Sequence, residues 1–153
     1  MSRRITTSSL AKVANVNRIW VQKAVELGLV NLQSLDGEDV IAVKVFTFAD
    51  QIIWPGERRS RSVTRDAAIW LSVAVAKARE AAGDPRTSAE TALWLMPDDV
   101  KVTQSTPEAF FFLAEGIKGR PAFRVPVGLW IDELPPGFEV PGRQPAPRVS
   151  AKH

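Results

Sequence analysis

The chain has 153 residues, of which 45% are hydrophobic and 24% charged, so its length suits one ordinary domain or two small ones and its composition is that of a globular protein. It contains no cysteine and no tyrosine, and its single histidine is His153, which excludes disulfides, thiolate metal sites and cysteine or tyrosine nucleophiles, and leaves histidine catalysis without support. The net charge of +3 is uneven, because residues 1–65 hold ten Lys or Arg against six Asp or Glu (+4), whereas residues 66–153 hold ten against eleven (−1).

The first predicted element is a pair of short helices. Hydroxyl residues at positions 6–9 can cap a helix over 8–14 by accepting hydrogen bonds from free backbone N–H groups. Residues 15–17 predict a tight turn, and a second helix over 18–27 ends where Gly28 can adopt a left-handed conformation. Two helices joined so closely predict a helix-turn-helix, in which the first helix supports the second in the major groove of DNA.

A hairpin is expected next. Strand-like runs at 29–35 and 40–46 lie on either side of Asp36-Gly37, and Asp-Gly between such runs is typical of a β-hairpin turn, here a wing. A further short helix is expected over 47–54, ended by Pro55 because proline disfavours helical geometry in the residue before it.

Residues 5–54 resemble the MerR family and the related excisionase-like winged helices. Residues 10–30 follow, without gaps, that family's order of Leu-Ala, a turn, a recognition helix and Gly-Leu-Leu, and residues 44–50 are similar to its Arg-x-Tyr-Thr-x-x-Asp segment. Asn15 stands where the family commonly has a turn glycine, and Gln22 where it usually has arginine. The resemblance covers about a third of the chain. It implies binding of double-stranded DNA.

The remainder predicts a second unit. A helix over 65–82 has few polar positions and must therefore be buried on most sides. The elements expected after it are a helix over 88–95, a strand over 100–103, a helix over 107–115 and a strand over 122–131.

The predicted fold class is α+β. A winged helix-turn-helix domain at 1–56 is followed by an Arg-rich linker at 57–65, and then by a small, mainly helical α+β domain at 66–133 for dimerisation or partner binding. Prolines from residue 134 onward predict an extended tail at 134–153.

The candidate DNA contacts are polar residues of the predicted helix-turn-helix, its wing and the linker. Arginine can bind guanine bidentately and asparagine or glutamine can bind adenine, while hydroxyls, lysine and clustered arginines can contact phosphate. The predicted DNA-binding residues are Ser8, Ser9, Asn17, Arg18, Gln22, Lys23, Lys44, Arg58, Arg59 and Arg61. The competing interpretation of each is a helix cap or a solvated side chain without a partner.

We therefore expect a sequence-specific DNA-binding protein of the cytoplasm and nucleoid that regulates transcription, and the resemblance favours a phage, plasmid or mobile-element origin. The expected partners are double-stranded DNA, further copies of the chain as a homodimer or a DNA-templated oligomer, and a protein that contacts the second unit. We expect no enzyme activity, metal, cofactor or membrane insertion. One alternative is an excisionase-like or partition-type architectural protein that assembles on repeated sites and recruits a partner. The other is a protein-interaction module that uses residues 110–112 and does not bind DNA.

Overall fold

The structure is a computed structural model that describes residues 6–33, 35–57 and 65–140. Within this part of the chain the fold is mixed α+β, as predicted, with six α-helices and one three-stranded antiparallel sheet. In chain order the elements are α1 (Thr7–Ala14), α2 (Arg18–Glu26), α3 (Gly37–Asp50), α4 (Arg65–Gly83), β1 (Ala92–Met96), β2 (Asp99–Thr103), α5 (Thr106–Phe111), the π-helical turn η1 (Phe112–Gly116), β3 (Phe123–Val125) and α6 (Val127–Asp132).

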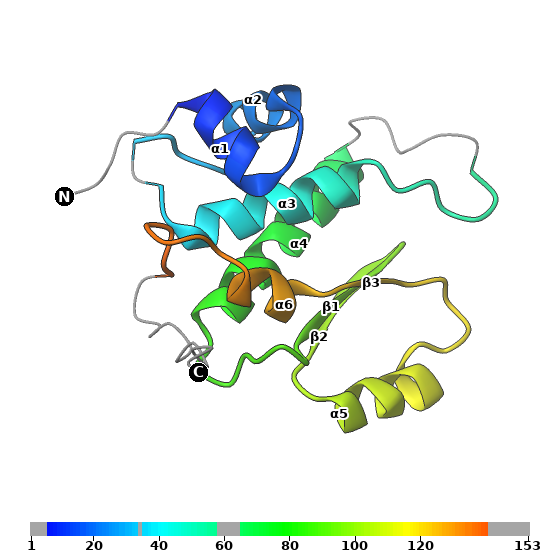
Figure 1. Ribbon diagram of the computed structural model, residues 1–153. Helices are drawn as coiled ribbons and strands as arrows, with labels where there is room; N and C mark the ends of the chain where they lie inside the picture. The colour runs from blue at the N-terminus through cyan, green and yellow to red at the C-terminus, as the bar shows by residue number, and fades with distance from the viewer. Residues whose placement is uncertain (1–5, 34, 58–64, 141–153) are drawn as a thin grey trace, which may run out of the picture.

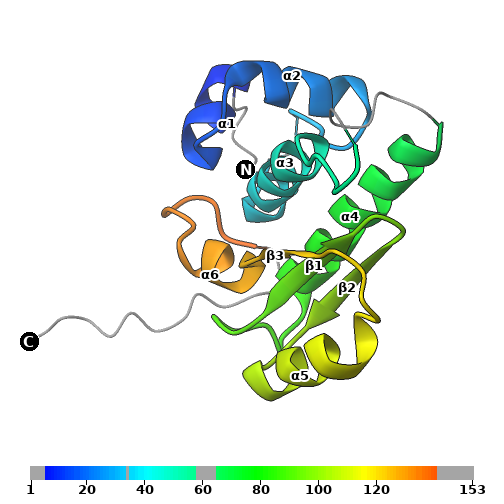
Figure 2. The same cartoon turned by 90° about the vertical axis from the view of Figure 1, so that its right-hand side faces the viewer.

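The central element is α3. Helices α1 and α2 lie together on one side of it and α4 on the other (Figure 1). Turning the molecule shows the order α1 and α2, then α3, α4, the sheet, and α5 at the far end (Figure 2). The strand order is β2-β1-β3, and β1 is antiparallel to both neighbours. The pair formed by α1 and α2 therefore caps one end of a layered molecule.

The predicted wing is wrong, because the segment expected to form its second strand is the buried helix α3. Asp36 is the N-cap of α3 and accepts hydrogen bonds from the backbone N–H groups of Glu38 (2.8 Å) and Asp39 (3.3 Å), while Asp39 Oδ2 accepts one from Asp36 N (2.9 Å). Burial of the Asp36 carboxyl raises its pKa. A Cβ on Gly37 would lie 2.1 Å from the carbonyl oxygen of Phe138, so glycine serves a close packing contact and not a hairpin turn.

The same helix replaces the short helix predicted over 47–54, since α3 runs without a break to Asp50. Its apolar residues occur on all sides because α1, α2, α4 and α6 surround it. A continuous apolar run fits a buried strand or a buried helix equally well, so periodicity alone could not distinguish them.

Thr47 carries a buried hydroxyl on α3, and its Oγ1 has no hydrogen-bond partner among the described residues. We expect Thr47→Val to raise the free energy of unfolding by about 1 kcal/mol, because valine has the same shape and removes an unsatisfied polar atom. Chemical denaturation measures this change. The matched control is Thr91→Val, since Thr91 Oγ1 accepts from Ser88 N (3.0 Å) and donates to Gln104 (2.9 Å) and its loss should destabilise the fold. Loss of stability in both variants would contradict this prediction.

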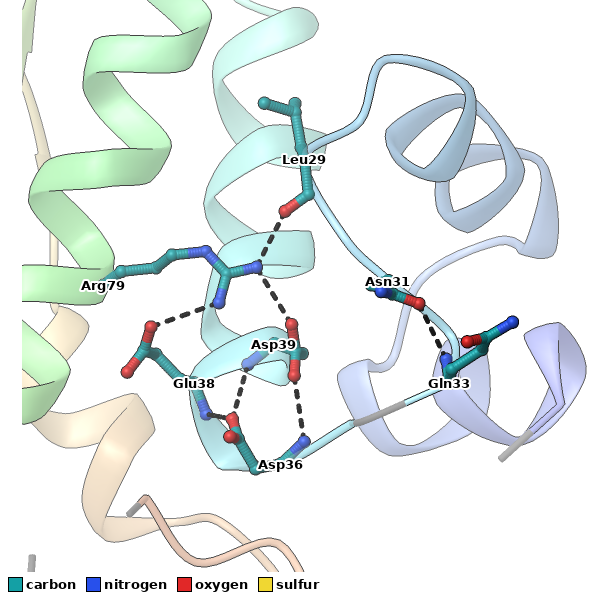
Figure 3. A network of polar contacts seen from close by, with 7 residues as sticks. All are labelled: Leu29, Asn31, Gln33, Asp36, Glu38, Asp39 and Arg79. Carbon is teal, nitrogen blue, oxygen red and sulfur yellow. Dashed lines mark hydrogen bonds and ion pairs between the residues drawn. The ribbon is translucent and has the colours of Figure 1, made fainter. Parts of the chain in front are cut away.

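Arg79 on α4 joins the two sides of the molecule (Figure 3). Its guanidinium donates to Asp39 Oδ1 (2.9 Å), Glu38 Oε1 (3.2 Å) and the carbonyl oxygen of Leu29 (2.7 Å). One side chain thus ties α4 to the start of α3 and to the segment that leaves α2.

The sheet contains the second wrong prediction. The helix expected over 88–95 is instead a turn followed by β1, which pairs with β2 from Ala92↔Thr103 to Met96↔Asp99. Every residue of β1 is buried, because α4 lies on one face of the sheet and α5 on the other. Burial on both faces removes the alternation that identifies a strand from sequence. The predicted strand over 100–103 and helix over 107–115 are confirmed as β2 and as α5 with η1.

The strand predicted over 122–131 is only partly correct. It ends at Val125, and the remainder forms α6 after Pro126. The tail predicted from residue 134 packs on the fold as far as Val140, since Phe138 and Val140 are buried and Gly37 N donates to the carbonyl oxygen of Glu139 (3.2 Å). Residues 141–153 lie outside the described part of the chain.

One apolar core connects the elements on both sides of the predicted 57–65 linker. A single cluster of buried residues extends from Leu10 on α1 through Phe46 on α3 and Ala78 on α4 to Leu95 on β1. The long helix predicted over 65–82 is confirmed as α4, and its buried side faces both α3 and the sheet. Its expected burial on most sides is only partly correct, because Ile69, Val73 and Ala76 on the other side are exposed. None of the helices in the described ranges combines the length and apolar character needed to cross a bilayer.

Candidate nucleic-acid interface

The turn between α1 and α2 has a defined geometry. Asn15 adopts a left-handed conformation with φ 58°, which asparagine tolerates better than most residues that have a Cβ. Val16 N donates to the carbonyl oxygen of Ala11 (2.9 Å), and Asn17 caps α2 by accepting from Ile19 N (3.0 Å). Asn15 therefore adopts the left-handed backbone conformation for which glycine is commonly used at such a turn.

Packing against α3 fixes the orientation of α2. Val21 and Ala24 are fully buried, Leu10 of α1 is buried beside them, and the Trp20 ring meets the Phe46 ring edge-on at 6.3 Å between centroids. Leu27, the C-cap of α2, is 41% exposed.

The opposite side of α2 is uncovered. We call Arg18, Ile19, Gln22 and Glu26 the α2 outer face; all four are exposed, and Ile19 is 65% exposed. At 100° per residue they lie within an arc of about 100° around the helix axis. Arg18 and Gln22, both predicted contacts, therefore point the same way, into solvent.

Lys23, also predicted to contact DNA, turns to α3 instead. Its Nζ lies 2.6 Å from Asp50 Oδ2 and 5.5 Å from the Trp20 ring centre. The Asp50 side chain is 7% exposed, so this ion pair anchors the end of α2 to α3 and is not a free cation for a ligand.

The start of α1 lies in solvent. Thr6 is the N-cap and accepts from Ser9 N (3.1 Å), so the capping function that could have occupied Ser8 or Ser9 falls to Thr6. Ser8, Ser9 and Lys12 are all exposed. They form a short polar surface that ends one turn along α1.

The predicted position of Lys44 on a wing is wrong. It lies on α3, with its Nζ 4.6 Å from the centre of the Trp130 ring of α6. Burial lowers the pKa of Lys44, and the charge of Glu133 opposes that shift. Arg58, Arg59 and Arg61 lie outside the described residues.

The surface formed by the start of α1 and the α2 outer face carries little positive charge. Neither Lys12 nor Arg18 has an ion-pair partner among the described residues, whereas Lys23 is paired and Glu26 adds a negative charge to the α2 outer face. In the described ranges no cluster of three or more His, Asp or Glu side chains could hold a metal ion. The arrangement offers hydrogen-bond donors, the carboxylate of Glu26 as an acceptor and the apolar side chain of Ile19, which suits recognition of a polar surface.

Two members of the α2 outer face, Ile19 and Glu26, were missing from the predicted set. The prediction chose amide, basic and hydroxyl residues by their type, but a helical projection centred on Gln22 includes Ile19 and Glu26 as well.

Comparisons of the chain with protein-family models, with curated proteins and with solved structures found no match.

Proposed function

We propose that this chain is a sequence-specific double-stranded DNA-binding protein in which α1 and α2 act as a helix-turn-helix and the α2 outer face enters the major groove. The observation that carries the proposal is that this face is exposed while the rest of α2 is fixed to α3. A recognition helix needs both properties, because base contacts require an uncovered face and a rigid support. The resemblance to MerR and excisionase-like domains supports the same function, without a hairpin wing.

The residues of the α2 outer face suit the edges of base pairs. Arg18 can donate two hydrogen bonds to guanine, Gln22 can pair bidentately with adenine, and Glu26 can accept from the cytosine amino group. Ser8, Ser9 and Lys12, at and after the start of α1, are suited to phosphate, since a helix N-terminus and a lysine both favour an anion. Arg58, Arg59 and Arg61 would add sequence-independent affinity.

Ile19 gives the proposal a specific base preference to test. An exposed aliphatic side chain in a major groove has one apolar partner there, the 5-methyl group of thymine. We expect replacement of one thymine by uracil in the bound site to weaken binding of the wild-type protein about 3- to 10-fold. The same replacement should leave the affinity of the Ile19→Ala variant unchanged, because that variant lacks the side chain that contacts the methyl group. Fluorescence anisotropy with the four combinations measures the coupling. Equal losses for both proteins at every thymine would remove Ile19 from the interface.

In vitro selection tests the proposed function. The purified chain is incubated at low salt with a library of random duplexes, and bound DNA is recovered, amplified and sequenced through several rounds. We expect enrichment of a motif that contains a guanine and an adenine within one major-groove face. No retained DNA, or no enriched motif, would contradict sequence-specific binding.

The arrangement of selected sites distinguishes two roles. One inverted pair of half-sites indicates a dimeric regulator of transcription, which is the role we propose. Several direct repeats filled cooperatively indicate the architectural alternative, in which the protein assembles along DNA and recruits a partner.

A separate surface favours protein interaction as a second candidate function. Phe110 and Phe111 are 68% and 69% exposed, and Leu113 beside them is also exposed. Phe112 alone of this run is buried, against Trp94 of β1 at 5.4 Å between ring centroids. Adjacent exposed aromatic side chains are typical of contact sites.

A further inference from the structure

Helix α4 carries an apolar strip on the side that faces away from the core. We call Ile69, Ser72, Val73 and Ala76 the α4 strip; all four are exposed, with Ile69 54% and Val73 41% exposed. Their spacing of i, i+3, i+4 and i+7 places them on one helix face. They line a shallow, open hollow of about 420 Å³ that Ala68 completes.

The order of large and small side chains along the α4 strip is self-complementary. If a second α4 runs antiparallel with a two-fold axis between Ser72 and Val73, Ile69 of one copy lies opposite Ala76 of the other and Val73 opposite Ser72. Every large side chain then meets a small one, as the interlocking of two helix surfaces requires. A parallel pair would place Ile69 against Ile69 and leave Ala76 facing Ala76 across a gap.

Charge favours the same direction. Glu80 is exposed and lies on the same face of α4, one turn beyond Ala76. In a parallel pair the two Glu80 carboxylates would face each other. In the antiparallel pair each Glu80 lies beside the first turn of the other α4, which begins at residue 65, where the partial positive charge of a helix N-terminus attracts a carboxylate.

The hollow continues towards α2. A second, smaller cavity of about 60 Å³ shares Ala68 and Ser72 with the first and is bordered by Leu27, Leu29 and the Lys23–Asp50 pair. A helix packed on the α4 strip would therefore also lie near the exposed Leu27 at the end of α2.

We propose that the α4 strip is the interface of a homodimer, in which α4 packs antiparallel against α4 of a second copy about an axis between Ser72 and Val73. Four side chains cover less than the roughly 800 Å² per partner of a standard interface, so the free dimer is weak and forms in proportion to concentration. Sedimentation velocity over a wide concentration range should show the transition from monomer to dimer.

Cysteine crosslinking tests the geometry, and the natural chain has no cysteine to interfere. In the proposed pair the two residues at position 73 flank the axis, within the roughly 4 to 7 Å between Cα atoms that a disulfide spans, whereas those at position 80 are about 22 Å apart. We expect Val73→Cys to form an oxidised dimer and Glu80→Cys to form none under the same conditions. Crosslinking of both variants would mean a parallel pair, and crosslinking of neither would mean no pairing through α4; each result overturns the proposal.

A second pair of variants tests the surface without oxidation. Val73→Glu places a charge in the strip and should keep the protein monomeric at every concentration, with an unchanged circular dichroism spectrum. Phe111→Glu makes the same kind of change on the exposed face of α5 and should leave the dimer intact. A wild-type chain that stays monomeric, or a dimer lost in Phe111→Glu and kept in Val73→Glu, would refute the α4 interface.

The dimer does not depend on DNA, and all of these measurements are made without it. Its consequence for DNA rests on the proposed function: two copies related by a two-fold axis would present two α2 outer faces to inverted half-sites. A failed DNA selection would leave the dimer standing, and a monomeric chain would leave the DNA contacts of α2 standing.

Discussion

Arg18→Ala combined with Gln22→Ala is expected to reduce discrimination between the selected duplex and a scrambled duplex by about 100-fold. Each bidentate base contact contributes about 1 to 3 kcal/mol of discrimination, and both side chains belong to the same exposed face. The measurement is competition anisotropy at fixed salt, with the selected and scrambled duplexes as competitors. Because neither side chain is buried, the fold should be unaffected.

The matched control for the lost charge is Lys101→Ala, at an exposed residue of β2. It removes one positive charge, as Arg18→Ala does, but from a strand that α3 and α4 separate from α2. We expect its discrimination between the two duplexes to equal that of the wild type. If the double variant of α2 discriminates as well as Lys101→Ala, the proposed base contacts are wrong.

The second large effect is expected from Arg79→Ala, which should lower the free energy of unfolding by about 3 kcal/mol. The variant leaves the Asp39 carboxylate and the Leu29 carbonyl without the donor that they share, and Asp39 is buried. Breaking a buried ion pair typically costs about 3 to 5 kcal/mol, and partial exposure of Arg79, at 27%, reduces the expected loss. Urea denaturation followed by tryptophan fluorescence measures it.

Arg86→Ala is the control for that prediction. Arg86 also forms an ion pair, with Asp84 at 2.8 Å, but its side chain is 76% exposed. An exposed pair contributes about 0 to 1 kcal/mol, so this variant should be nearly as stable as the wild type. Equal losses of unfolding free energy in the two variants would show that the contacts of Arg79 with α3 and with Leu29 stabilise the fold no more than an exposed ion pair does.

The local signals of the first two helices were sufficient to predict them. A hydroxyl cap, the asparagine-containing turn and Gly28, with φ 75°, are short-range features, and all four ends of α1 and α2 lie within one residue of the expected bounds. Helix α4 could also be predicted from the sequence, because a run of that length rich in alanine favours a helix and is too long for a strand.

The two largest errors, at residues 40–46 and 88–95, share one physical cause. Residues 92–96 form a fully buried apolar run, and residues 40–46 form an apolar run that is buried except at the half-buried Lys44; neither run has a clear periodicity. Tertiary packing then determines whether such a run forms a helix or a strand. The first run is part of the helix α3, and the second is the strand β1. The Asp36-Gly37 pair added to the first error, since Asp36 caps a helix and Gly37 makes room for Phe138, a contact with a residue about 100 positions away.

The candidate interface was predictable in part. Arg18 and Gln22 belong to the α2 outer face, as their spacing indicated, but Lys23 binds Asp50 and Lys44 packs on Trp130. Both partners lie far along the chain, so no local pattern could show that these two lysines are occupied. Residue type alone also omitted Ile19, which is apolar yet exposed.

Nuclear magnetic resonance tests the central claim most directly. The ¹⁵N-labelled chain, of 16.8 kDa, is titrated with the selected duplex, and amide shifts are followed along the sequence. We predict the largest shifts at Ser8, Ser9 and residues 17–22, with the amides of β1, β2 and α5 nearly unchanged. Shifts concentrated on α5 or the sheet while residues 17–22 stay still, or no shifts at any ratio of DNA to protein, would contradict the account.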